Sequence, residues 1–352
     1  MIQPILFLIC SLFMILLSAE FFTNGVESFG RRFSLSQAVV GSILAAVGTA
    51  LPETILPLVA ILVHGDDTGR KIGVGAILGA PFMLSTLAFF VVGATVVISM
   101  LRKKRKFVLY IDTSSIRRDL IFFIIMYGSA IFLPFLLPYS HLLIAGLLLI
   151  GYVLYVYSTF KAESADIIHA DQLHFEKLFS DFRRLAGLQL RSARAEPYKT
   201  TSLLLICFQI AASLGVMVGG AELFVGSLEK LSLSWGMSPL LFALLVAPIA
   251  TELPEKFNSV TWTLKGRDTL AMGNITGAMV FQTTFPVSVG LLFTEWHISG
   301  LALFSAVLAL VSALIVLANI QFGKKISPAA MLFGGVIYSI FALAVLLNQS
   351  VH

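Results

Sequence analysis

Two glutamates each stand directly after a proline inside a long apolar stretch, in 48-GTALPETILP-57 and in 250-ATELPEKFNS-259. A proline within a helix has no N–H and pushes away the carbonyl four residues earlier. The carbonyls freed in this way are those of Gly48 and Ala250. A bare carbonyl in an apolar environment is costly unless a partner satisfies it, and a bound cation is one such partner.

A threonine hydroxyl accompanies each of these carboxylates. Thr49 and Glu53 are spaced i and i+4, so they share one face of a helix. Thr251 and Glu255 repeat this arrangement. The carbonyl, hydroxyl and carboxylate oxygens of both segments would suit Ca²⁺, which takes about six to eight oxygen ligands. Two carboxylates balance two monovalent cations or two protons equally well, and this competition for one site is the chemical basis of exchange.

The composition indicates a membrane protein. Of the 352 residues, 58% are hydrophobic and only 12% are charged, with a mean hydropathy of +0.94, whereas soluble domains carry about 25% charged residues. Apolar runs of about 20 residues, long enough to cross a bilayer, recur along the chain. Carboxylates at membrane depth are functional candidates by default. We expect an all-α polytopic fold of ten membrane helices, over 3–25, 35–63, 72–100, 119–138, 140–160, 202–229, 237–264, 269–293, 297–319 and 326–348.

The chain contains an internal repeat with a spacing of 202 residues. The corresponding segments are 19-AEFF-22 with 221-AELF-224, 51-LPE-53 with 253-LPE-255 and, after a change in loop length, 75-GAILGA-80 with 273-GNITGA-278. An odd number of helices in each half would make equivalent helices cross in opposite directions, which predicts an inverted repeat with binding near the midplane. We expect a first repeat over 1–160, a linker loop over 161–200 and a second repeat over 201–352.

Basic residues gather on one predicted side of the membrane. The loops of that side hold 20 of the 24 Lys and Arg residues, which identifies it as cytoplasmic and places both termini outside. The net charge of +5 therefore reflects topology, and we expect no nucleic-acid partner. A chain this short, without a large regulatory insert, suits a prokaryotic inner membrane. The sequence gives no oligomeric state.

The paired motifs resemble those of the calcium/cation antiporter superfamily, whose best-known branch is the sodium–calcium exchangers. The pattern G-T-S-x-P-E of that family appears as 48-GTALPE-53 and, more loosely, as 250-ATELPE-255. Its partner pattern, G-N-x-x-G-S-N or G-S-D, appears as 273-GNITGAM-279 and, degenerately, as 75-GAILGAP-81. The resemblance covers essentially the whole chain. It implies alternating-access exchange of a cation, often Ca²⁺, against Na⁺, K⁺ or H⁺, with no cofactor.

The resemblance also implies roles for particular residues. Glu53 and Glu255 would be the central ligands of the metal ion. Thr49 and Thr251 would contribute further oxygens. Asn274 would be the surviving amide of the second partner motif. Small inorganic cations and the lipid bilayer are then the expected partners.

Several positions depart from the family pattern. Ala50 replaces a serine, Ala76 replaces an asparagine, and Pro81 and Met279 stand where an asparagine or aspartate is usual. Side-chain oxygens of the flanking Na⁺ sites are therefore missing, and a sodium-exchanger stoichiometry cannot be carried over. We favour Ca²⁺ exchange for Na⁺, with exchange of Ca²⁺ or another cation for H⁺ as the alternative and a cation channel as the less favoured one. No nucleophile with a base is visible at membrane depth, so we expect no enzyme.

Glu252 and Lys256 are a further feature of the second motif. Their i, i+4 spacing permits an ion pair within one helix. One interpretation is a neutralised pair that replaces lost polar contacts. The other is that Glu252 is a third cation ligand or a proton carrier, tuned by Lys256. The sequence leaves both interpretations open.

Overall fold

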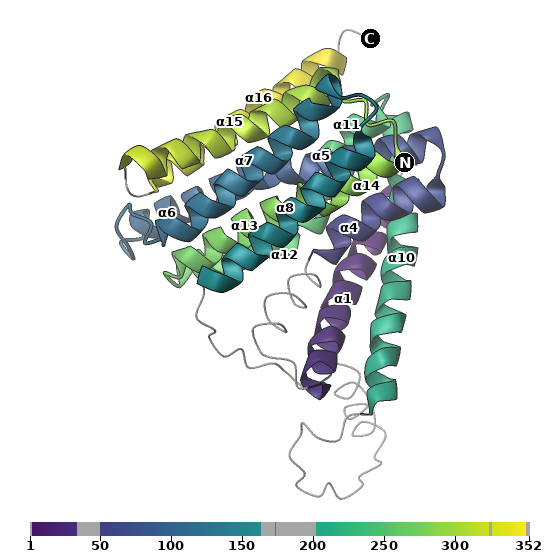
Figure 1. The fold of residues 1–352 in the computed structure, drawn as a ribbon, viewed down its shortest axis with the longest axis horizontal. Helices are drawn as coiled ribbons and strands as arrows, with labels where there is room; N and C mark the ends of the chain where they lie inside the picture. Colours follow the sequence, from purple (N-terminus) through teal and green to yellow (C-terminus); the bar gives the residue numbers. More distant parts are fainter. Residues whose placement is uncertain (1, 34–49, 163–172, 174–201, 324–325, 350–352) are drawn as a thin grey trace, which may run out of the picture.

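The computed structural model describes residues 2–33, 50–162, 173, 202–323 and 326–349 (Figure 1). Every regular element within these ranges is a helix. The first part of the span expected over 35–63 lies outside the described residues, and so does the 161–200 loop apart from its first two residues and Leu173.

The described residues of the first half of the chain form five helical runs. They are α1 (Ile2–Arg32); α4 (Leu51–Leu58), continued by the π-helix η2 (Val59–His64); α5 (Asp67–Met83), continued by the π-helix η3 (Leu84–Ala88) and by α6 (Phe89–Leu101); α7 (Thr113–Leu136); and α8 (His141–Ala162). The second half contains α10 (Leu203–Ser234), α11 (Pro239–Thr251), α12 (Leu253–Leu264), α13 (Asp268–Gln282), α14 (Phe285–Phe293), α15 (Gly300–Gly323) and α16 (Pro328–Gln349).

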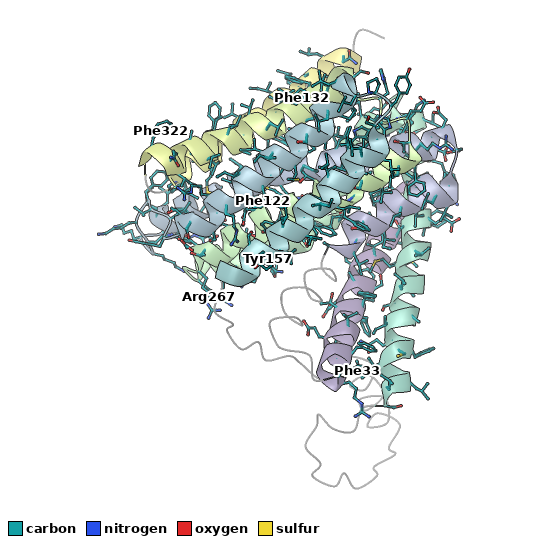
Figure 2. The ribbon with its side chains drawn as sticks, viewed as in Figure 1. Phe33, Phe122, Phe132, Tyr157, Arg267 and Phe322 are labelled. Atoms are coloured by element: carbon teal, nitrogen blue, oxygen red, sulfur yellow. The ribbon has the colours of Figure 1, made fainter. Side chains whose placement is uncertain are left out.

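Eight of the described helical runs are long and apolar enough to cross a membrane, and Leu51–His64 and Pro239–Thr251 are shorter apolar helices. Large apolar side chains such as Phe132 and Phe322 are exposed on the outer faces of these helices (Figure 2). An apolar exterior of this kind is what lipid contact requires. The chain is a multi-pass membrane protein, and the expected all-helical fold is confirmed.

Two of the expected spans are interrupted helices. The span over 237–264 consists of α11 and α12, which meet at Glu252, and the span over 269–293 consists of α13 and α14, which meet at Thr283 and Thr284. The cause is the same in both places, because α12 and α14 each begin with a proline within their first two positions. Proline cannot donate to the helix before it, but it fits the first turn of a new one.

The packing of the helices follows the internal repeat. Where α5 packs on α15, its counterpart α13 packs on α7, and where α6 packs on α12 and α16, its counterpart α14 packs on α4 and α8. The equivalent helices α1 and α10 pack against each other along their length, and one end of the pair projects beyond the other helices (Figure 1). Each of these contacts of α5 and α6 therefore has a partner contact when the halves are exchanged, as expected for an inverted repeat.

The buried apolar residues form two clusters. The larger joins α5–α8 with α13–α16, and the smaller lies where α1 and α10 meet α4, η2, α5 and α11. The contact between α5 and α11 is made by two glycines: a Cβ at Gly75 would collide with the carbonyl of Leu240, and one at Gly79 with that of Leu244. Small residues four apart permit such close approach of two helices in a membrane. They bring α5 directly against the helix that leads into the second Leu-Pro-Glu motif.

Candidate cation site at the helix breaks

The second Leu-Pro-Glu motif forms the break between α11 and α12. The α11 helix ends at Thr251, and Glu252 has φ −90° and ψ 9° before α12 begins at Leu253. Residue 254 is a proline without an N–H, so the carbonyl of Ala250 lacks its usual donor four residues later. Thr251 and Glu255 are both buried beside this break. The broken helix expected in the second repeat is therefore present.

The first motif is described only from Ala50 onward. Gly48 and Thr49, both predicted site residues, lie outside the described residues. The α4 helix begins at Leu51, and Glu53 in its first turn is 5% exposed. A second proline, Pro57, removes the donor for the carbonyl of Glu53 itself. The helix then passes into the π-helical η2, a departure that is frequent at functional sites.

The acidic residues of the two motifs lie close enough for their charges to interact. Glu255, Glu252 and Lys256 lie near enough to Glu53 for their charges to act on it. Both carboxylate oxygens of Glu53, Oε1 of Glu252 and Oε2 of Glu255 are buried and have no hydrogen-bond partner among the described residues. Buried polar atoms are almost always partnered. Carboxylate oxygens from both halves of the chain that have no hydrogen-bond partner among the described residues are groups that a bound cation would satisfy.

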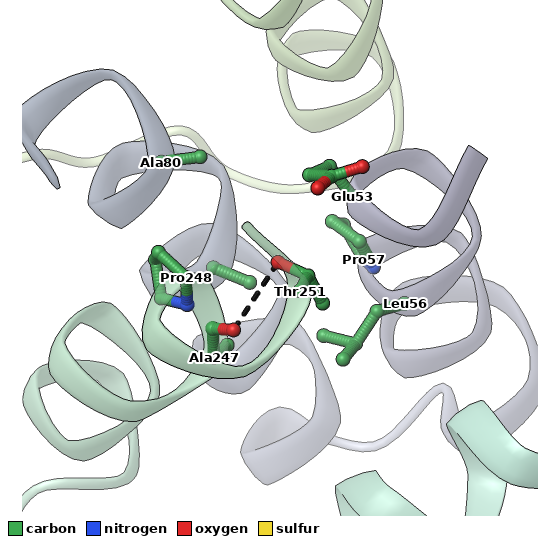
Figure 3. A pocket seen from close by; sticks show the side chains of 8 residues that line it. Glu53, Leu56, Pro57, Ala80, Ala247, Pro248 and Thr251 are labelled. Atoms are coloured by element: carbon green, nitrogen blue, oxygen red, sulfur yellow. Dashed lines mark hydrogen bonds between the residues drawn. The ribbon is translucent and has the colours of Figure 1, made fainter. Parts of the chain in front are cut away.

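A small cavity of about 10 Å³ opens beside Glu53, between α4, α5 and α11 (Figure 3). Its lining consists of Glu53, Leu56, Pro57, Ala76, Ala80, Ala247, Pro248 and Thr251. Figure 3 shows Glu53 and Thr251 among the side chains that line it, from α4 and from α11. The Thr251 hydroxyl donates to the carbonyl of Ala247 at 3.2 Å, which leaves its oxygen able to accept or to ligate. Ala76, one of the departures from the family pattern, contributes only a methyl group to this wall.

Asn274 contacts the backbone of the second motif. Its Nδ2 lies 3.4 Å from the carbonyl oxygen of Glu255 and 3.5 Å from the hydroxyl of Ser259, both on α12. Ser259 in turn donates to the carbonyl of Ala271 on α13. The amide therefore ties α13 to α12 at the residue that carries the carboxylate.

The ion pair permitted by the spacing of Glu252 and Lys256 is formed. Lys256 Nζ lies 3.0 Å from Glu252 Oε2, with the Glu252 side chain fully buried and that of Lys256 11% exposed. The ammonium also approaches the carbonyl oxygen of Pro248 at 3.4 Å and the sulfur of Met83 at 3.1 Å. The pair uses only one of the two Glu252 oxygens, since Oε1 has no partner among the described residues.

Another buried carboxylate lies outside the set of residues predicted from the sequence. Asp119 on α7 is 3% exposed, accepts a hydrogen bond of 2.7 Å from Thr276 and pairs with Arg118 at 3.1 Å. Thr276 belongs to the 273-GNITGA-278 motif. The signal was an acid at the first position of the span expected over 119–138.

Across the described part of the chain, no three Asp, Glu, His or Cys side chains form a group ready to hold a metal ion. A cation between Glu53 and Glu255 would therefore need backbone and hydroxyl oxygens as well.

The inverted repeat and the interrupted helices define the class of protein as a polytopic membrane protein with the architecture of a secondary transporter. The chain belongs to the sodium/calcium exchanger protein family, because the model of that family matches residues 3–161 and 205–349. The two matched segments correspond to the two halves of the repeat.

Similar proteins include CaxA of Alkalimonas amylolytica, named as a proposed antiporter, which is 25% identical over 307 residues, 86% of this chain and 84% of that protein. The inner membrane protein YrbG of Escherichia coli is 22% identical over 295 residues, 84% of this chain and 81% of that protein. These relatives match the chain across both repeats and the connection between them.

Solved structures share the fold. The crystal structure of the H⁺/Ca²⁺ exchanger CAX superimposes with a TM-score of 0.68 at 17% identity, covering 99% of this chain and 88% of that one. The sodium–calcium exchanger NCX_Mj superimposes with a TM-score of 0.55 at 20% identity, covering 97% of this chain and 98% of that one. The predicted family and the expected inverted-repeat fold are thereby confirmed.

Proposed function

We propose that this exchanger binds Ca²⁺ between Glu53 and Glu255 and exchanges it for Na⁺ by alternating access. The observation that carries the proposal is the approach of two buried carboxylates, one from each repeat, whose charges act on each other. Their oxygens lack partners among the described residues, so a cation would satisfy them.

The remaining ligands would come from the helix breaks. The carbonyl of Ala250 and the hydroxyl of Thr251 stand at the second break, and the carbonyl of Gly48 and the hydroxyl of Thr49 are their counterparts in the first repeat. Asn274 would hold the backbone of Glu255 in register with α13. The free Oε1 of Glu252 is a further candidate oxygen. Together these are the hard oxygen ligands that Ca²⁺ prefers.

Exchange, and not leakage, follows from the electrostatics of such a site. Two carboxylates without counter-ions inside a membrane are costly, so an empty site would resist the movement of one repeat against the other. One Ca²⁺ neutralises both carboxylates, and two monovalent cations do the same. The protein would therefore change readily between its outward-facing and inward-facing states only with cations bound.

Proton coupling is a second candidate, favoured by the wall of the cavity beside Glu53. Ala76 and Ala80 supply methyl groups there, where the family pattern would supply an amide and a hydroxyl. A carboxylate with few neighbouring oxygens can be neutralised by a proton without any further ligand. We therefore keep H⁺ as the alternative coupling ion.

The arrangement in the membrane is also a proposal. The distribution of Lys and Arg supports a cytoplasmic linker over 161–200 and termini on the outside. We propose two functional halves, 1–160 and 201–352, and a prokaryotic inner membrane as the location.

The test is Ca²⁺ uptake into proteoliposomes that contain the purified protein. An outward Na⁺ gradient and a pH gradient are applied in separate vesicles, with protein-free vesicles as the control. Uptake driven by Na⁺ supports the first proposal, and uptake driven only by the pH gradient supports the second. Absence of uptake under both gradients would contradict Ca²⁺ exchange.

A further inference from the structure

The ammonium of Lys256 lies beside a carboxylate and a backbone carbonyl, which are oxygen groups of the kind that bind small cations, and beside a methionine sulfur. Around Nζ are the carboxylate Oε2 of Glu252 at 3.0 Å, the carbonyl oxygen of Pro248 at 3.4 Å and the sulfur of Met83 at 3.1 Å. These groups come from the helix break, from α11 and from the end of α5. The ammonium therefore has neighbours on α5, on α11 and at the junction between α11 and α12, as an ion in a binding site would have.

This position is electrically part of the proposed exchange site. The charges of Glu255, Glu252 and Lys256 all act on Glu53. With all four groups ionised, three carboxylates and one ammonium leave two net negative charges. One divalent cation or two monovalent cations neutralise this remainder.

We propose that the Lys256 ammonium is a resident cation that permanently fills one monovalent position beside Glu252. The cycle then exchanges one divalent cation for two monovalent cations and moves no net charge. The inference rests on the proposed exchange function and adds the ratio of the exchanged ions. A tethered ammonium cannot leave the site, so it neutralises Glu252 in every state while the carboxylates of Glu53 and Glu255 change their partners.

The alternative is that the ion pair between Glu252 and Lys256 is only structural. The two interpretations predict different behaviour of the space that is left when the lysine side chain is removed. Lys256→Ala removes the ammonium but keeps the Glu252 carboxylate, the Pro248 carbonyl and the Met83 sulfur. If these groups form a cation position, free Na⁺ will enter it. If the pair serves only to neutralise a buried acid, the position will not select an ion.

The first experiment measures Na⁺ binding without transport. Thermal unfolding in detergent is followed at increasing NaCl, with choline chloride as the control for ionic strength and saturating Ca²⁺ to keep the central site filled. We expect Na⁺ to raise the Tm of Lys256→Ala in a concentration-dependent manner, and to leave the Tm of the wild type unchanged. No added stabilisation of Lys256→Ala by Na⁺ would overturn the proposal.

The matched control is the double variant Glu252→Gln with Lys256→Ala, which removes the ammonium and its counter-charge together. We expect Na⁺ to give this variant no stabilisation, because the carboxylate that would hold the ion is gone. An equal rise in Tm in the single and double variants would place the Na⁺ elsewhere and would also overturn the proposal. The difference in Na⁺ stabilisation between the single and the double variant tests the position beside Glu252 whether or not the wild type transports Ca²⁺.

The second experiment measures the charge moved by the wild type. Ca²⁺ uptake into proteoliposomes is compared at membrane potentials of opposite sign, set with K⁺ gradients and valinomycin. We expect the same uptake rate at both potentials and a ratio of two monovalent cations per Ca²⁺ at zero net flux. A rate that depends on the potential, or a ratio of three, would overturn the resident-cation proposal while leaving Ca²⁺ exchange intact.

Discussion

Arg105 and Asp268 join the two halves of the repeat through a forked ion pair. The Arg105 guanidinium donates to both carboxylate oxygens of Asp268, at 2.9 and 2.6 Å, and also to the carbonyl of Thr263 at 3.0 Å. Asp268 additionally accepts the backbone N–H of Tyr110 at 2.9 Å. The loop after α6 is thus fastened to the first turn of α13.

Removal of this pair will lower the stability of the fold. In Arg105→Ala the carboxylate of Asp268, whose side chain is fully buried, loses its counter-charge. Breaking a buried pair on one side costs about 3–5 kcal/mol, and the partial exposure of Arg105 places the expected loss at the lower end of that range. Thermal unfolding in detergent measures it, with the exposed Lys71→Ala, which loses only a surface pair with Asp67, as the control. Equal Tm values for the two variants would contradict the assigned role.

Because α5 packs closely on α11, we expect Gly79→Ala to lower both the stability of the protein and its rate of Ca²⁺ uptake. The added Cβ would collide with the carbonyl of Leu244 and crowd the ring of Pro248, and both belong to the helix that carries the second motif. Overpacking of this kind costs about 1–3 kcal/mol. We expect a lower Tm and slower Ca²⁺ uptake, measured on the same preparation.

The matched control for that substitution is Gly128→Ala on α7. A Cβ at Gly128 meets no atom within 4 Å, so the same chemical change adds no clash. Its Tm and uptake rate should equal those of the wild type or exceed them slightly, because alanine favours the helix. If Gly128→Ala lowered the Tm and the uptake rate as much as Gly79→Ala, the packing of α5 on α11 would not be the cause of the effect at Gly79.

Thr251→Val tests the hydroxyl at the second break. Valine keeps the shape of the side chain, so the expected effect is the loss of one oxygen from the cation site. A lost polar interaction of about 1.4 kcal/mol corresponds to roughly tenfold weaker Ca²⁺ binding. The KM for Ca²⁺ in vesicle uptake measures this change. Thr263→Val is the control, because its hydroxyl bonds the Ser259 carbonyl of the same helix at 2.7 Å and lies near the far end of α12.

Asp112, which lies outside the membrane spans, should make a pH-dependent contribution to the stability of the fold. Hydrogen bonds from the hydroxyl and the N–H of Ser114 lower the pKa of Asp112, which caps the first turn of α7. A lowered folded-state pKa means that the carboxylate stabilises the fold above its usual pKa and loses this effect as the pH falls through the folded-state value. Asp112→Ala should cost about 1 kcal/mol at neutral pH.

The measurement compares the Tm of Asp112→Ala with that of the wild type at neutral pH and at a pH below the ordinary aspartate pKa. The difference should shrink on acidification. Asp112→Asn serves as the control, since asparagine also caps helices well but carries no titrating group. A difference that is independent of pH would contradict the charged cap.

Local chemistry allowed the helix break and the fold to be predicted from the sequence. Pro254 lacks an N–H whatever the tertiary structure around it. The two Leu-Pro-Glu segments reveal the repeat without comparison with any other protein. The break at Thr283 and Thr284 was overlooked, although Pro286 carries the same signal in an otherwise apolar run.

Contacts between distant segments could not be predicted in this way. Arg105 was counted only as a cytoplasmic charge, yet it pairs with Asp268, 163 residues further along the chain. The approach of Met83 to Lys256 depends on how α5 packs, and α5 is positioned by glycines whose partners the sequence does not reveal. Spacing within one helix predicts a pair such as Glu252 with Lys256, whereas pairs between helices require the fold.

The central claim is that one site is shared by a carboxylate from each repeat. Ca²⁺ uptake into proteoliposomes by Glu53→Gln and by Glu255→Gln tests it most directly, with size-exclusion profiles and Tm values to confirm that each variant is folded. Both substitutions preserve the shape of the side chain and remove one negative charge. The account predicts that either variant, although folded, loses exchange. Uptake at the wild-type rate by either one would contradict the shared site.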